Sequence, residues 1–128
     1  MKNIILAIMV MLGFSCSSNG QNSEFENMDV NQFAKYIAND SVQTLDVRTP
    51  DEFYEGHIND AININVFDDD FLDEATKELD KSRPVAVYCR SGKRSVDAAQ
   101  KLSAAGYKVT NLEGGIIAWI KSGKPVVK

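Results

Sequence analysis

Cysteine, histidine and positive charge are all scarce in this sequence of 128 residues. Its two cysteines are too few for a disulfide framework, and they do not have the Cys-x-x-Cys spacing of a zinc site. With His57 as the single histidine, a transition-metal centre has little to build on, so we expect neither a metal nor another cofactor. Lysine and arginine number 14 against 18 aspartates and glutamates, and the net charge of −4 argues against general binding of nucleic acids.

The apolar run at the N-terminus, residues 4–14, is short for a transmembrane helix, which needs roughly 20 apolar residues. It follows the positive charge of Lys2 and precedes Ser15 and Cys16. This order is typical of a secretory signal peptide. A buried N-terminal helix is the alternative, but such a helix would carry polar residues at helical spacing, and this run has none.

Cys16 directly follows the apolar run and precedes the polar segment SSNGQNS. A cysteine in this place resembles the bacterial lipoprotein signal, in which the cysteine becomes the new N-terminus and carries lipid. The usual leucine three residues before the cysteine is replaced by Gly13, and Leu12 lies one residue further back. The alternative is an ordinary cleaved signal with an incidental cysteine.

These features divide the chain into three parts. We expect residues 1–15 to be the signal peptide, residues 16–24 to be the lipidated cysteine and a flexible tether, and residues 25–128 to be the folded domain. The domain would then be exported and lie on the periplasmic side of a bacterial membrane, anchored by lipid to either the inner or the outer membrane.

Short apolar runs alternate with helical patterns along residues 25–128, and a single domain of ordinary globular composition fits this length. This alternation predicts an α/β fold, with a mostly parallel sheet covered by helices on both faces in a three-layer α/β/α arrangement. Strands are predicted at residues 44–47, 61–66, 85–89 and 109–112. Helices are predicted at residues 30–37, 51–54, 71–79, 95–105 and from 114 onward.

Residues 68–80 hold seven acidic residues and one lysine. The segment lacks the glycine and the ligand spacing of a calcium-binding loop. We therefore interpret it as a helix with an acidic face exposed to solvent.

The run with the clearest chemistry follows the predicted strand at residues 85–89. In parallel α/β sheets, ligands bind beyond the carboxyl ends of the strands. Cys89 is expected at such a strand end, where the backbone N–H groups of the following loop and the positive end of the next helix would favour its thiolate over its thiol. The same cradle would hold the negative charge of a leaving group. A buried cysteine alone would be interpreted as a core residue, but the cationic glycine loop favours catalysis. The run reads Cys89-Arg90-Ser91-Gly92-Lys93-Arg94-Ser95.

Further motifs accompany this loop in a fixed order. They are Leu45-Asp46-Val47-Arg48, then Glu52-Phe53, Gly56-His57-Ile58 and Ala61-Ile62, then the Cys89 loop, and finally Gly114-Gly115, Trp119, Gly123 and Pro125-Val126. Together they resemble the rhodanese-like sulfurtransferases over residues 25–127. One departure is Asn65, where that family often has proline in a turn.

The resemblance implies a single-domain enzyme in which Cys89 takes a sulfane sulfur from an anionic donor such as thiosulfate. The resulting persulfide would pass its outer sulfur to cyanide or a thiol, so ping-pong kinetics are expected. The loop residues Arg90, Ser91, Gly92, Lys93, Arg94 and Ser95 would bind substrate. Arg94 could instead brace the loop through an acidic residue, and the sequence leaves both roles open.

The length of the loop and the single nucleophile also bear on other functions. Related phosphatases have five residues between the cysteine and the arginine of the loop, whereas four separate Cys89 from Arg94, a ring that suits phosphate poorly. A persulfide carrier or redox partner protein, and a non-catalytic binding module, remain alternatives. His57 is expected to hold a loop rather than to act as a base, and Asp46 and Arg48 are expected to form a structural pair or to serve as hydrogen-bond anchors.

Overall fold

The computed structural model describes residues 25–128, so the predicted signal peptide, Cys16 and the tether lie outside the described residues. The strands are β1 (Glu26–Met28), β2 (Gln43–Asp46), β3 (Ile62–Asn63), β4 (Val85–Tyr88) and β5 (Val109–Leu112). The helices are α2 (Val30–Ile37), α3 (Pro50–Glu55), α4 (Phe71–Glu78), α5 (Lys93–Ala104) and α6 (Gly115–Lys121).

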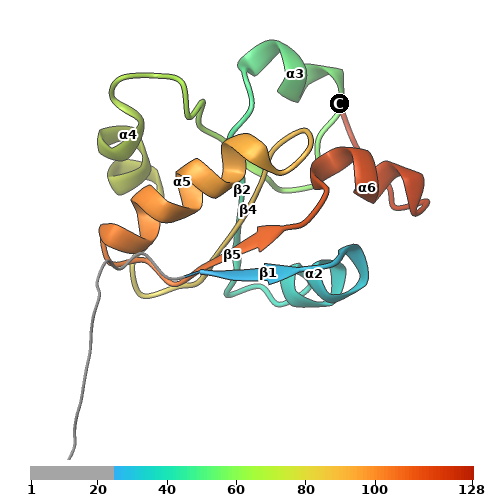
Figure 1. Cartoon of the computed structure of the whole chain (residues 1–128), viewed down its shortest axis with the longest axis horizontal. Helices are drawn as coiled ribbons and strands as arrows, with labels where there is room; N and C mark the ends of the chain where they lie inside the picture. The colour runs from blue at the N-terminus through green and yellow to red at the C-terminus, as the bar shows by residue number, and fades with distance from the viewer. Residues whose placement is uncertain (1–24) are drawn as a thin grey trace, which may run out of the picture.

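The strands form one five-stranded sheet in the order β1-β5-β4-β2-β3, and every neighbouring pair is parallel. The central strands β2 and β4 are buried along their whole length because helices cover both faces of the sheet (Figure 1). The predicted α/β architecture is therefore confirmed.

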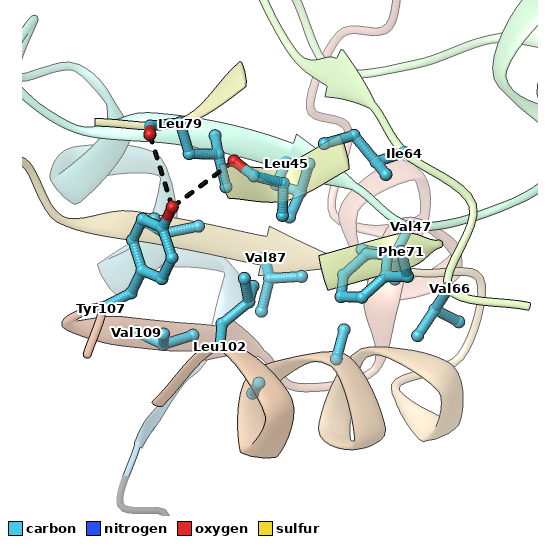
Figure 2. Close-up of a cluster of buried hydrophobic side chains, with 14 of the residues drawn as sticks. Leu45, Val47, Ile64, Val66, Phe71, Leu79, Val87, Leu102, Tyr107 and Val109 are labelled. Carbon is cyan, nitrogen blue, oxygen red and sulfur yellow. Dashed lines mark hydrogen bonds between the residues drawn. The ribbon is translucent and has the colours of Figure 1, made fainter. Parts of the chain in front are cut away.

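Alternate residues of β4 point to opposite faces of the sheet and into separate hydrophobic clusters. On one face, Val85 and Val87 pack with residues of α4 and α5, including Phe71 and Leu102 (Figure 2). The Tyr107 hydroxyl lies 3.4 Å from the carbonyl oxygens of both Ala75 and Leu79, at the end of α4. This cluster fixes α5, and with it the loop that precedes α5, against the sheet.

On the other face, Ala86 and Tyr88 pack with residues of α2 and α6. Phe33 of α2 meets Trp119 of α6 edge to face, with ring centroids 6.3 Å apart. The Trp119 indole N–H donates to the carbonyl of Pro125 at 2.8 Å, which ties the C-terminal segment to α6.

Strand β1 was not predicted from the sequence. It is an edge strand, and its residues Glu26, Asn27 and Met28 include no β-branched or aromatic side chain. Its parallel ladder with β5 is extended by Glu113 N, which donates to Met28 O at 2.9 Å, and by the Asn111 side chain, which donates to Asn27 Oδ1 at 3.0 Å.

The predicted strand at residues 61–66 pairs with β2 only at Ile62 and Asn63. The Asn63 side chain donates to the carbonyls of Asp46 and Arg48 at 3.0 and 2.9 Å, which adds side-chain contacts to this short ladder. The backbone nonetheless follows β2 further, since Val66 N donates to Val47 O.

Helix α4 exposes its acidic residues, including Asp73 and Glu78, while Phe71, Ala75 and the following Leu79 are buried. This confirms the prediction of an acidic helix face turned to solvent.

Candidate active site

Cys89 directly follows the last residue of β4, at the carboxyl edge of the sheet. Its side chain is 1 % exposed, and its Sγ accepts a hydrogen bond from Gly92 N at 3.0 Å. Figure 1 shows the loop from β4 to α5 ending among α3, α5 and α6. The predicted strand-end position of Cys89, facing a backbone N–H of its own loop, is confirmed.

Gly92 makes the turn that leads the loop into α5. Its φ of 104° lies in the left-handed region that side chains rarely adopt, and it serves as the N-cap of the helix. A Cβ at this position would lie 3.5 Å from Gly114 N, an ordinary contact, so the constraint is conformational. Helix α5 consequently begins at Lys93, two residues before the predicted start.

The start of α6 clamps the first carbonyls of the loop. Ile116 N donates to Cys89 O at 2.9 Å, and Ile117 N donates to Arg90 O at 3.2 Å. Because the C=O and N–H of a peptide plane point in opposite directions, these bonds turn the following amides away from α6. The approach is close enough that a Cβ on Gly115 would collide with the carbonyl of Arg90 and lie 2.6 Å from Cys89 O.

Arg94 forms a bidentate ion pair with Glu52 of α3, at 2.7 and 2.8 Å. The Arg94 guanidinium lowers the pKa of the Glu52 carboxyl to about 2, and the hydrogen bonds that Arg94 donates to Glu52 raise the pKa of Arg94. The same carboxylate accepts hydrogen bonds from the backbone and hydroxyl of Thr49, the N-cap of α3. Of the two roles that the sequence left open for Arg94, this geometry favours bracing the loop.

Arg90 and Ser91 on the loop and Lys93 at the start of α5 are exposed, so both cations are accessible to an anionic ligand. Ser95 is different, because it is fully buried in the first turn of α5. Its hydroxyl has no hydrogen-bond partner within residues 25–128. The substrate contacts expected of these residues stay predictions.

Beneath the loop, Asp46 and Arg48 form a buried ion pair of 2.6 Å, which confirms the predicted structural pair. Arg48 also donates to Gly56 O at 2.7 Å, and its guanidinium lies 5.8 Å from the ring centroid of Tyr88. Burial raises the pKa of the Tyr88 phenol, whose oxygen accepts from Ile58 N at 3.0 Å. This network joins β2 and β4 to the turn after α3.

His57 also has a structural position. Its Nδ1 lies 2.9 Å from the carbonyl of Phe53, and its ring stacks on the Phe53 ring with centroids 3.7 Å apart. Its backbone exchanges two 2.8 Å hydrogen bonds with Val127. The expectation that His57 holds a loop is confirmed.

Sequence reasoning identified Cys89 and its loop but missed two supports of that loop. The sequence places Glu52 in a motif and Gly115 both in a motif and at a predicted helix start, but it predicts no contact of either residue with the loop. The capping box of Thr49 and Glu52 and the paired glycines at 114–115 were visible signals, but their contacts with the loop cross the fold.

In the part of the chain that the structure describes, no group of three or more His, Cys, Asp or Glu residues is placed to hold a metal ion. Within the same residues, no helix has the length and apolar character to cross a membrane.

Comparison with known proteins bears on this geometry. The rhodanese-like domain model matches residues 29–122. Thiosulfate sulfurtransferase 18 of Arabidopsis thaliana is 37% identical over 124 residues, covering 88% of this chain and 90% of the relative. Thiosulfate sulfurtransferase GlpE of Shewanella oneidensis is 37% identical over 98 residues, covering 76% and 94%.

Solved structures agree with the sequence comparisons. A rhodanese-related protein from Thermoplasma volcanium matches with a TM-score of 0.71 and 35% sequence identity, over 80% of this chain and 98% of that one. The chain therefore belongs to the rhodanese-like domain family of sulfurtransferases.

Proposed function

We propose that the protein transfers a sulfane sulfur from thiosulfate, or a similar anionic donor, to a nucleophilic acceptor through a persulfide on Cys89. The observation that carries this proposal is the position of Cys89 Sγ, 3.0 Å from Gly92 N at the end of a buried strand. A sulfur held there by a backbone N–H is stabilised as an anion, which is both the attacking group and the group released at the end.

In the first half-reaction, the Cys89 thiolate attacks the outer sulfur of thiosulfate. A new S–S bond forms to Cys89 as the S–S bond of thiosulfate breaks, and sulfite leaves with the bonding electron pair. The exposed cations Arg90 and Lys93 attract the doubly charged donor to the loop. The products are sulfite and a Cys89 persulfide.

In the second half-reaction, an acceptor nucleophile attacks the outer sulfur of the persulfide. Cyanide gives thiocyanate, whereas a thiol gives a new persulfide and passes its proton to solvent or to the departing group. The Cys89 thiolate is released in both cases, so no external oxidant or reductant is consumed.

The test separates the half-reactions. Incubation with thiosulfate alone should release one sulfite for each active site and add the mass of one sulfur atom to the peptide that contains Cys89. Subsequent cyanide should yield thiocyanate and restore the original mass. A protein that never gains sulfur from thiosulfate, while remaining folded, would contradict the thiosulfate assignment.

We further propose that the protein is exported and anchored by lipid on Cys16, on the periplasmic side of a bacterial membrane. The support is the order of Lys2, the apolar run at residues 4–14 and Cys16 in the sequence. Residues 16–24 would then act as a tether between the lipid and the domain.

A further inference from the structure

Within residues 25–128, the large apolar side chains that remain exposed are unevenly distributed. One of them, Leu72, lies on α4. The others lie on α3, after β3, on α6 or in the C-terminal segment, the elements around the Cys89 loop: Tyr54, Phe67, Ile117, Ile120, Val126 and Val127. Exposed apolar side chains gathered in one area mark a surface that contacts another molecule.

Three of these residues, Ile117, Ile120 and Val126, line a groove of about 310 Å³ beside the active loop. Arg90 also lines the groove and directly follows Cys89, so the groove adjoins the nucleophile. The remaining lining residues come from β2's end, α3 and the start of α6: Arg48, Glu52, Glu55, Gly56 and Ile116.

The wall formed by the C-terminal segment is fixed without a ligand. Val127 exchanges two 2.8 Å backbone hydrogen bonds with His57, and the Trp119 indole holds Pro125 at 2.8 Å. Figure 1 shows the C-terminus lying between α3 and α6. A groove whose wall is already in place lowers the entropic cost of binding.

Neither thiosulfate nor cyanide has an apolar part, so these small anions make no use of the groove. Cys89 is only 1 % exposed, and a flat protein surface could not bring a thiol to it. A protruding segment could, with its cysteine in the loop and a neighbouring apolar side chain in the groove.

Charge indicates the character of that segment. Residues 114–128 contain Lys121, Lys124 and Lys128 but no acidic residue, although the protein carries a net charge of −4. Arg90 on the loop and Lys93 at the start of α5 add positive charge beside the groove. Of the two acidic residues that line it, Glu52 is paired with Arg94, which leaves Glu55 against these cations. A partner that is acidic near its cysteine is complementary to the cations.

We propose that the groove docks the thiol-bearing segment of an acidic acceptor protein, whose cysteine is flanked by an apolar and an acidic side chain. This rests on the proposed function, since the acceptor thiolate attacks the outer sulfur of the Cys89 persulfide. The S–S bond breaks, Cys89 leaves as a thiolate, and the acceptor carries the new persulfide. The thiol proton of the acceptor is released, so atoms and electrons balance without a further reactant.

The test uses full-length protein loaded with sulfur from thiosulfate, and short peptides with a single cysteine flanked by leucine and aspartate. Ile120→Ser should lower the second-order rate constant of sulfur transfer to this peptide about tenfold, because one apolar side chain loses its contact. Thiocyanate formation from cyanide should stay close to the wild-type rate. A peptide with lysine in place of aspartate should react more slowly, and the difference should shrink as salt is added.

Leu72→Ser and Ile117→Ser form a matched pair, since each wild-type side chain is 37 % exposed on a helix and only Ile117 lines the groove. Only Ile117→Ser should slow the peptide reaction. Equal losses of the peptide rate constant in Leu72→Ser and Ile117→Ser would overturn the proposal. It would also be overturned if Ile117→Ser slowed sulfur transfer to propanethiol as much as transfer to the peptide, because the groove would then serve small thiols. The proposal would likewise be overturned if the wild-type protein formed a dimer that Ile120→Ser dissociates, because a second copy would then occupy the groove. If wild-type protein makes no thiocyanate, the proposed function fails instead.

Discussion

The sulfur of Cys89 is held by its own loop rather than by a neighbouring acid or base. Cys89→Ser should reduce thiocyanate production below about one-thousandth of the wild-type rate, because a hydroxyl is a poor nucleophile and leaves poorly from sulfur. The fold should survive, since the side chain lies at the edge of the core and keeps its size. Circular dichroism and thermal unfolding serve as the control, and near-normal thiocyanate from a folded variant would refute the mechanism.

The Glu52–Arg94 pair makes stability depend on pH. The pKa of Glu52 is about 2 in the folded protein and 4.5 as an isolated group, so the folded state binds its proton less readily. The stabilisation is therefore present above about pH 4.5 and is lost as the pH falls toward 2. Because both side chains are partly exposed, we expect a loss of about 1–2 kcal/mol.

Urea unfolding across this pH range measures the effect. Wild-type protein should lose more stability between pH 4.5 and pH 2 than Glu52→Gln, which has no carboxyl to titrate. At neutral pH, Glu52→Gln should already be less stable and should transfer sulfur more slowly, since Arg94 would lose its brace. Identical pH profiles for the two proteins would contradict the role given to the pair.

Helix α6 positions the loop through the contact of Gly115 with the carbonyls of Cys89 and Arg90. Gly115→Ala should slow sulfur transfer about 100-fold, because the added methyl group must push the loop aside by roughly an ångström. Gly123→Ala is the matched control. Its φ of 81° is also left-handed, but nothing lies within 4 Å of the added Cβ.

Both glycine variants should lose about 1 kcal/mol or more of stability from backbone strain. Thiocyanate assays on equal amounts of folded protein separate this loss of stability, which both variants share, from the displacement of the loop, which only Gly115→Ala should cause. Equal activity in the two variants would show that close packing at Gly115 does not position Cys89.

The molecule as a whole is proposed to work at a membrane, and that proposal depends on one residue outside the described domain. Cys16→Ala should move the protein from the membrane fraction to the soluble fraction of cells that express the full chain, because the lipid is lost. Sulfur transfer in solution should be unchanged. If both proteins distribute alike, an ordinary cleaved signal explains the N-terminus better.

Local patterns in the amino-acid sequence were sufficient to predict most of the fold and the position of Cys89 at the end of a buried strand. The apolar run before Cys89, the glycine and cations after it, and the alternation of strands and helices depend on neighbouring residues, and their physics acts over a few positions. Strand β1 escaped prediction because its side chains carry no strand signal and its pairing partner lies far along the chain.

The supports of the site were decided only by the tertiary structure. Arg94 and Glu52 are 42 positions apart in the sequence, and parallel pairing of β2 with β4 is what brings α3 beside the loop. Gly115 meets the loop because β5 lies next to β4. The groove likewise needs α3, α6 and the C-terminal segment together. Contacts of this kind follow from the order of strands in the sheet, which no local pattern encodes.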